Sequence, residues 1–365
     1  MRLGLFMMPL HSPGRDLAAL LREDQEAILL ADRLGFDEAW VGEHLTASTE
    51  PISSPLIFLA TLIGGTKRIL LGTGVLPLPH HHPAVVAGHC ALFDQLSGGR
   101  LLLGIGPGGL PSDIELFGLL GRDDRGDRMI EAIDMILQIW QGEPPWRFDG
   151  RFWQFAVEQS VLPHLGVGPM LKPLQRPHPP VAISVLGPNS GLAHLAGTRG
   201  WSPISANFVP QSAIATHWPL YAKGCAAAGR PADPAHWRVA RSVLVTEDDA
   251  QARDYLARPG SGLRFYYRYL CDQLSAAGQS RAFKADPALP DAALTDDYLM
   301  ENIVIAGSPE TVARRLGRLR QDLGPFGTLL VAAHEWDEPT MWRRSMELLA
   351  GDVRARLAAS EGRDL

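Results

Sequence analysis

The chain has 365 residues, of which 46% are hydrophobic and 20% charged, and its mean hydropathy is −0.02. This composition supplies a large apolar core and excludes intrinsic disorder. The 34 Lys and Arg against 40 Asp and Glu leave a net charge of −6, which argues against nucleic acid and anionic membrane surfaces as partners.

Short apolar runs alternate with helical patterns from the N-terminus onward. Residues 3–8 predict a strand stopped by Pro9, and apolar spacing over residues 16–34, closed by Gly35, predicts a helix. Further strands are predicted at residues 38–41, 69–76 and 101–105, followed in turn by helices at 55–65, 84–96 and 126–141. The later strands are predicted at residues 181–185, 201–204, 239–245 and 328–332.

Eight strands that alternate with helices favour a parallel sheet closed into a (β/α)8 TIM barrel, because each crossover helix must cover the outer face of the sheet. An open doubly wound sheet is the weaker alternative, since no GxGxxG opens the first helix. We expect one barrel domain over residues 1–365.

Two segments interrupt the alternation. Residues 143–180 are rich in proline and lack periodicity, which predicts an ordered irregular connection. Residues 258–302 mix Gly, Pro and Asp with aromatic residues, and such a long insertion near the C-terminal strands is typical of a lid or flap, or of a surface excursion. After it, Ser308, Pro309 and Glu310 predict the start of another helix.

The cysteines and the N-terminus indicate a cytoplasmic protein. Cys90, Cys225 and Cys271 show no CxxC spacing, which argues against a disulfide framework and a thiolate zinc site. Pro9 and His11 interrupt the N-terminal apolar run before it completes a signal-peptide core, and no later stretch is long enough to span a bilayer.

Active sites of barrels lie where the strands end, which singles out His44. Its imidazole could exchange a proton with a ligand, with Glu43 orienting it or anchoring the loop, although a histidine here can also be structural. The run His80, His81, His82 suggests a metal, but a polar loop leading to a helix that starts at Pro83 is the favoured interpretation, so no metal site is predicted.

Two glycine-rich segments also follow strands. Residues 104–109 allow close backbone approach to a ligand, or simply a sharp turn. Residues 187–191 open a helix and suggest a phosphate site at Asn189, Ser190 and Gly191, or ordinary capping by Asn189 or Ser190. Arg125 and Arg128 begin the helix after the fourth strand and could pair with the same phosphate or remain solvated.

Taken together, these motifs resemble one family. The segments LGLF, DEAWVGEH, KRILLGTGVLPLPHHHP, FDQLSGGRLLLGIGPG, RMIEAIDMI and AGSPETVARRL occur in the same order as in the bacterial luciferase-like flavin-dependent monooxygenases. The segment GIGPGGLPSD is similar to the limonene-monooxygenase-like branch. The resemblance runs nearly end to end and is most specific over the first 140 residues.

The resemblance implies a barrel that binds reduced FMN (FMNH2), reacts it with O2 to a flavin hydroperoxide and oxygenates a small hydrophobic substrate. It gives His44 a role in this chemistry and places a non-proline cis peptide at Gly74–Val75 beneath the flavin ring. Thr73 and Gly106 complete the expected ring contacts. The residues expected to bind the phosphate are Asn189, Ser190, Gly191 and Arg128. Where luciferases carry a reactive cysteine, a phosphate-binding arginine and a second histidine, this chain has Gly106, Pro107 and Leu45, which argues against luminescence with long-chain aldehydes.

The leading hypothesis is thus a two-component monooxygenase that receives FMNH2 from a separate NAD(P)H:flavin reductase. The alternatives are a deazaflavin-dependent dehydrogenase on the same barrel, a non-catalytic flavin-binding barrel and a metal-dependent hydrolase. The family's pairing through helices near the second and third strands suggests a homodimer.

Overall fold

The computed structural model describes residues 1–8, 10–324 and 326–361. Eight of the parallel strands in this part of the chain close into a barrel. In spatial order they are β1 (Arg2–Met7), β2 (Glu38–Val41), β3 (Leu70–Thr73), β5 (Leu101–Gly106), β8 (Val181–Val185), β9 (Ser202–Ser205), β10 (Arg238–Val245) and β12 (Thr328–Ala332).

Closure of the barrel rests on the pairing of its first and last strands. Phe6 of β1 pairs with Trp40 of β2 on one side and with Ala332 of β12 on the other. β10 completes the ring by pairing with both β9 and β12. The TIM-barrel prediction is therefore confirmed, and the open doubly wound alternative is wrong.

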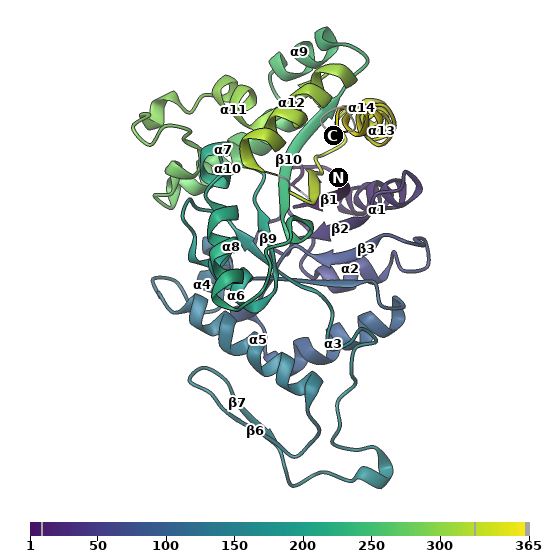
Figure 1. Ribbon diagram of the computed structural model, residues 1–365, viewed down its shortest axis with the longest axis vertical. Helices are drawn as coiled ribbons and strands as arrows, with labels where there is room; N and C mark the ends of the chain where they lie inside the picture. The colour runs from purple at the N-terminus through teal and green to yellow at the C-terminus, as the bar shows by residue number, and fades with distance from the viewer. Residues whose placement is uncertain (9, 325, 362–365) are drawn as a thin grey trace.

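Helices surround the strands (Figure 1). Those that follow the first five barrel strands are α1 (Leu17–Arg33), α2 (Pro55–Ala60), α3 (Pro83–Leu96), α4 (Pro111–Leu116), α5 (Arg125–Gln141) and α6 (Gly191–Arg199). The later ones are α7 (Gln211–Ile214), α8 (His217–Ala227), α9 (Asp249–Ala257), α10 (Gly262–Ala276), α11 (Asp296–Ile303), α12 (Pro309–Leu323), α13 (Pro339–Leu348) and α14 (Arg354–Glu361). An additional strand, β11 (Val304–Gly307), pairs with the C-terminal half of β10.

Two of the predicted segments differ from the structure. The single strand expected over residues 69–76 is divided into β3 and the short β4 (Leu76–Pro77), with a cis peptide at Gly74–Val75 between them. The irregular connection expected over 143–180 contains an antiparallel hairpin, β6 (Trp146–Asp149) with β7 (Gln154–Val157), which extends beyond α5 (Figure 1). Aromatic packing stabilises this hairpin, because the rings of Phe148 and Phe155 lie 4.7 Å apart.

The long insertion over residues 258–302 is largely helical, since it contains α10 and most of α11. Both helices lie beside α7 on one side of the barrel (Figure 1). As the sequence predicts, the following helix α12 begins with Ser308, whose hydroxyl accepts a hydrogen bond from the Thr311 amide.

The middle of the barrel interior is filled. A layer of buried side chains from six of the eight strands packs there: Trp40, Leu102, Ala182, Ile204, Ala240 and Leu330. Nearer the carboxyl ends of their strands, Phe6 and Ser184 are partly exposed, as is Val75 just after β3. Ligands bind at this end of parallel barrels, so these partly exposed residues are candidates for contact with a ligand.

No helix in the described residues is long and apolar enough to cross a membrane. Cys90, Cys225 and Cys271 are buried and free.

Candidate active site

His44 lies in the loop after β2, paired with a buried carboxylate. Its Nδ1 is 2.7 Å from Oε2 of Glu50, as a close ion pair rather than a well-aligned hydrogen bond. The ring is 17% exposed and the carboxylate 4%. Burial by itself would lower the pKa of His44, but contact with Glu50, helped by the charges of Asp113 and Glu43, raises it.

The partner of His44 is not its sequence neighbour. Glu43 instead contacts Nε2 of His81 at 2.6 Å and so links the loops after β2 and β4. Of the two roles considered for Glu43, the structure supports loop anchoring, and the expectation that it orients His44 is wrong. Adjacent residues in an extended loop point in opposite directions, so Glu43 and His44 face different neighbours.

A second carboxylate holds the same loop, and the sequence analysis did not find it. Asp113, near the start of α4, accepts hydrogen bonds from the Thr46 amide at 2.9 Å and the Thr46 hydroxyl at 2.6 Å, and from the Leu45 amide at 3.2 Å. Asp113 is 2% exposed. No local pattern pairs residue 113 with residue 46, although an acidic residue after Pro111 does indicate a helix start.

The predicted ring-contacting residues lie at the carboxyl ends of β3 and β5. The cis peptide at Gly74–Val75, which the family resemblance implied, is present. The Thr73 hydroxyl is used within the sheet, because it donates to the carbonyl of Gly104 at 2.8 Å and accepts from its amide at 3.0 Å. A Cβ on Gly106 would lie 2.6 Å from the Val75 side chain, so the glycine allows β5 to approach Val75 closely.

The three consecutive histidines have different surroundings. The His80 ring stacks on Phe117 at 4.6 Å, and its burial lowers the pKa to about 4. His81 contacts Glu43, while His82 accepts a hydrogen bond from the Ala84 amide and caps α3, which begins at Pro83. The predicted helix start at Pro83 is confirmed. The described residues contain no group of three or more His, Cys, Asp or Glu side chains that could hold a metal ion.

The predicted phosphate-binding residues occupy two helix starts. Ser190 caps α6 by accepting from the Leu192 amide, and Gly191 is the first residue of that helix. The exposed Asn189 has a φ of 54°, and its backbone amide donates to the Thr216 hydroxyl at 2.9 Å. Near the start of α5, Arg128 donates to Asp124 at 3.3 Å and covers the Phe152 ring at 4.4 Å. Capping by Ser190 is therefore confirmed, and phosphate binding stays a prediction.

One side of α10 lines a cavity of about 590 Å³. Its walls are Gly260, Arg264, Phe265, Arg268, Tyr269, Asp272, Gln273 and Asp296. The cavity adjoins the His44 loop, because the Thr49 hydroxyl donates to the hydroxyl of Tyr269 at 3.4 Å and Thr49 precedes Glu50. A volume of this size lies within the usual range for small-molecule sites.

A buried polar network fixes α10 against the barrel. The hydroxyl of Tyr267 lies 2.6 Å from that of Ser242, which in turn lies 2.7 Å from Nε2 of His334. Asn207 donates to the hydroxyl of Tyr266 at 3.1 Å. The aromatic run of α10 is thus divided between two faces: Tyr266 and Tyr267 pack onto the barrel, whereas Phe265 and Tyr269 reach the cavity.

The closed parallel barrel, with an imidazole–carboxylate pair and a cavity at the carboxyl ends of its strands, defines a barrel enzyme. The family description "Luciferase-like monooxygenase" matches residues 1–325. The chain therefore belongs to the luciferase-like monooxygenase family, as its motifs indicated, and it is an oxidoreductase.

Individual relatives match almost the whole chain. It is 34% identical to the 4-hydroxyprotoasukamycin monooxygenase of Streptomyces nodosus subsp. asukaensis over 98% of this chain and 92% of that protein. It is 32% identical to the limonene 1,2-monooxygenase of Rhodococcus erythropolis, over 96% and 85% of the two chains. Among solved structures, the oxygenating constituent of 3,6-diketocamphane monooxygenase from Pseudomonas putida, in complex with FMN, has a TM-score of 0.87 at 27% identity and covers 97% of both chains.

Proposed function

We propose that this protein is the oxygenase component of a two-component system, which uses reduced FMN and O2 to oxygenate a small hydrophobic substrate. The observation that carries the proposal is the His44–Glu50 pair, placed beside a cavity at the carboxyl ends of the barrel strands. Support also comes from the FMN complex of the diketocamphane relative, which is named an oxygenating constituent. A separate NAD(P)H:flavin reductase would then deliver the reduced cofactor.

The partly exposed residues at the carboxyl ends of the strands are those available to a flat ring. Phe6, Val75 and Ser184 lie above the filled layer, and Gly106 adds no side chain between Val75 and Ser184. We propose that the backbone at Thr73, Gly74 and Val75, together with Gly106, contacts the flavin ring. Asn189, Ser190, Gly191 and Arg128 are proposed to hold the phosphate, for which Arg128 would have to exchange its contact with Asp124.

Bound reduced FMN would supply the electrons that activate O2, and one atom of that O2 would be transferred to the substrate. The protein's part is to position the reactants, to exclude water and to manage one proton. Since Nδ1 of His44 faces Glu50, Nε2 is the ring atom left to exchange a proton with a ligand. The charge of Glu50 stabilises the protonated ring and so raises the pKa of His44, which favours a role for the ring as an acid.

Two further parts of the proposal concern the surroundings of the site. We propose that the insertion over residues 258–302, within the one barrel domain, covers the site as a lid. We also propose a homodimer through α3, whose side chains Val85, Leu92 and Leu96 are 51%, 49% and 61% exposed. Exposed apolar side chains on one element are typical of a subunit interface.

Anaerobic titration with reduced FMN tests the cofactor assignment directly. We expect binding at micromolar concentration, and absence of binding would contradict the proposal. Tighter binding of a reduced deazaflavin, with turnover that does not need O2, would instead establish the dehydrogenase alternative.

His44→Ala then separates an enzyme from a non-catalytic flavin carrier. With FMN, a flavin reductase, NADH and O2, oxygenation of a cyclic ketone should fall at least about tenfold, or about 1.4 kcal/mol in the barrier. The affinity for reduced FMN should stay close to that of the wild type. Unchanged turnover would show that His44 is not catalytic.

A further inference from the structure

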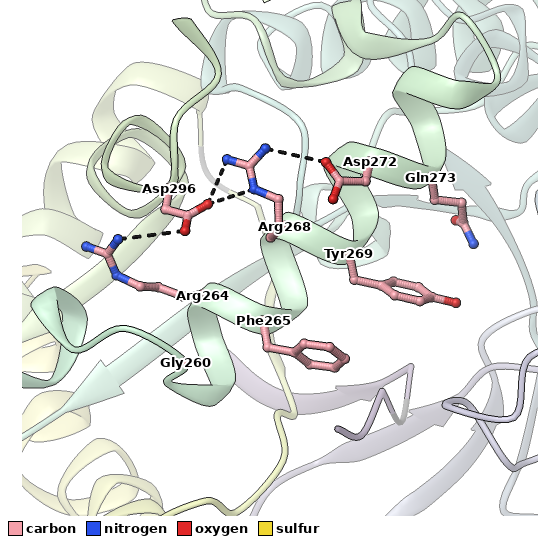
Figure 2. A pocket seen from close by; sticks show the side chains of 8 residues that line it. All are labelled: Gly260, Arg264, Phe265, Arg268, Tyr269, Asp272, Gln273 and Asp296. Carbon is pink, nitrogen blue, oxygen red and sulfur yellow. Dashed lines mark hydrogen bonds and ion pairs between the residues drawn. The ribbon is translucent and has the colours of Figure 1, made fainter. Parts of the chain in front are cut away.

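The side chain of Tyr269 connects the insertion over residues 258–302 to a loop of the candidate active site. Figure 2 shows it on α10, pointing away from the ion pairs of Arg268. Just before it in the helix, the Tyr267 hydroxyl lies 2.6 Å from that of Ser242 and ties α10 to the barrel. The position of the Tyr269 phenol is therefore set by the packing of α10 and not by the loop that it contacts.

The directions of the hydrogen bonds at this phenol follow from the chemistry of its two partners. The Thr49 hydroxyl donates to the phenol oxygen at 3.4 Å. A carboxylate has no proton to donate, so the phenol gives its own proton to the hydrogen bond with Glu50, the residue after Thr49. Burial, with the charge of Glu50, raises the pKa of Tyr269 and so keeps the phenol protonated.

Glu50 is thus a buried carboxylate shared by two donors. It is 4% exposed, and its Oε2 lies 2.7 Å from Nδ1 of His44. Within the part of the chain that the structure describes, no Lys or Arg lies at ion-pair distance from it. The Tyr266 phenol also lies near this charge and accepts a hydrogen bond from Asn207. His44 and Tyr269 therefore compete for the same negative charge.

The other titratable groups that face His44 are engaged elsewhere. Glu43 contacts a histidine of the loop after β4, and Asp113 of α4 accepts hydrogen bonds from the backbone of the loop that carries His44. Burial lowers the pKa of His80 to about 4, so this neighbouring ring is neutral. Glu50 is consequently the group through which α10 can act on His44.

The competition for Glu50 has a definite sign. A hydrogen bond from the phenol spreads the carboxylate charge over one more donor and weakens its attraction for the imidazolium. The phenol therefore bonds Glu50 more strongly when His44 is neutral than when it is protonated. By linkage, it limits the rise in the pKa of His44 that Glu50 causes.

We propose that Tyr269 is a positioning residue for the His44–Glu50 pair, which holds the Glu50 carboxylate in place and moderates its hold on the proton of the imidazole. The proposal rests on the proposed function for the use of that proton in turnover, but the coupling itself needs no flavin. The insertion then sets the proton affinity of His44, a role different from covering the site.

NMR titration of the flavin-free protein with labelled histidines tests this coupling, and His44→Gln assigns the resonance. Tyr269→Phe removes only the phenol oxygen. It should move the midpoint of the His44 titration upward by about 0.5 pH unit, a roughly threefold tighter hold on the proton, because one of the two donors to Glu50 is lost. Tyr298→Phe is the matched control, since this phenol of α11 donates to the carbonyl of Phe283, and it should leave the midpoint unchanged.

A double-mutant cycle shows whether the phenol acts through Glu50. Combined with Glu50→Gln, Tyr269→Phe should no longer move the His44 midpoint, because the shared charge is gone. Thr49→Val removes the donor to the phenol oxygen, which weakens the phenol as a donor, and should move the midpoint upward by less than Tyr269→Phe does. Thermal melts verify folding, and Thr49→Val tests the coupling even if Tyr269→Phe is unstable.

The proposal is overturned if Tyr269→Phe leaves the midpoint in place or lowers it, or if its effect persists beside Glu50→Gln. These titrations need no cofactor, so the expected shifts without binding of reduced FMN would refute the proposed function alone. In turnover assays, the alkaline limb of the pH profile should move to higher pH in Tyr269→Phe. A shifted midpoint with an unmoved limb would refute the acid role of His44 and not the coupling.

Discussion

Replacing Glu50 by Gln removes a negative charge 2.7 Å from Nδ1 of His44 and keeps the size of the side chain. With the ring 17% exposed and the carboxylate 4%, water screens this pair weakly. An interaction with a charged group contributes about 1.5–3 kcal/mol, and a neutral hydrogen bond about 1 kcal/mol. Glu50→Gln should therefore cost about 1–2 kcal/mol in free energy of unfolding whenever the His44 ring is protonated.

The sign of the pH dependence follows from the direction of the pKa shift. Because the pKa of His44 is raised in the folded protein, the pair stabilises the fold fully below the unfolded pKa of about 6.5. That stabilisation is lost as the pH rises through the folded pKa. The difference in stability between the wild type and Glu50→Gln should consequently be largest near about pH 5.5 and small near about pH 9.

Urea denaturation at these two pH values, followed by tryptophan fluorescence, measures this difference. Glu115→Gln is a matched control, since Glu115 is an exposed residue of α4. A stability difference for Glu50→Gln of equal size at both pH values would refute the electrostatic reasoning. In turnover assays the alkaline limb of the pH profile should also move to lower pH, because His44 must be protonated to act as an acid and its pKa falls without the charge of Glu50.

Three further variants test the fold and the assembly. Arg238→Met should lower the free energy of unfolding by about 3–5 kcal/mol, because it leaves the 1% exposed carboxylate of Glu38 without its guanidinium partner at 2.7 Å. Chemical denaturation measures this loss, and a variant as stable as the wild type would contradict the reasoning. Gly104→Ala places a Cβ 1.9 Å from a backbone carbonyl oxygen, so the variant should lose about 3 kcal/mol in free energy of unfolding or fail to fold. Gly126→Ala is the control, because a Cβ there meets open space and should be tolerated. Thermal melts compare the two variants. Leu92→Glu should shift the sedimenting species from dimer to monomer, and an unchanged dimer would place the interface elsewhere.

The polar contacts of the site could not be predicted from local sequence. Glu50 approaches His44 across a loop, Asp113 holds Thr46 from another helix, and Tyr267 reaches His334 through Ser242. A polar side chain has many possible partners along the chain, and no periodicity marks the right one. Glu43, for which adjacency left two roles open, contacts His81 and not His44.

Local patterns in the sequence are enough to predict the barrel and most of its elements. The strands at residues 38–41 and 328–332 have the predicted bounds, and Ser308 starts its helix as expected. These features depend on the spacing of apolar residues and on the capping of helix ends. Both are set by residues that are close together in the chain. Tertiary structure decided which charges meet at His44 and which aromatic residues of α10 face the cavity, because those choices depend on how distant segments pack together.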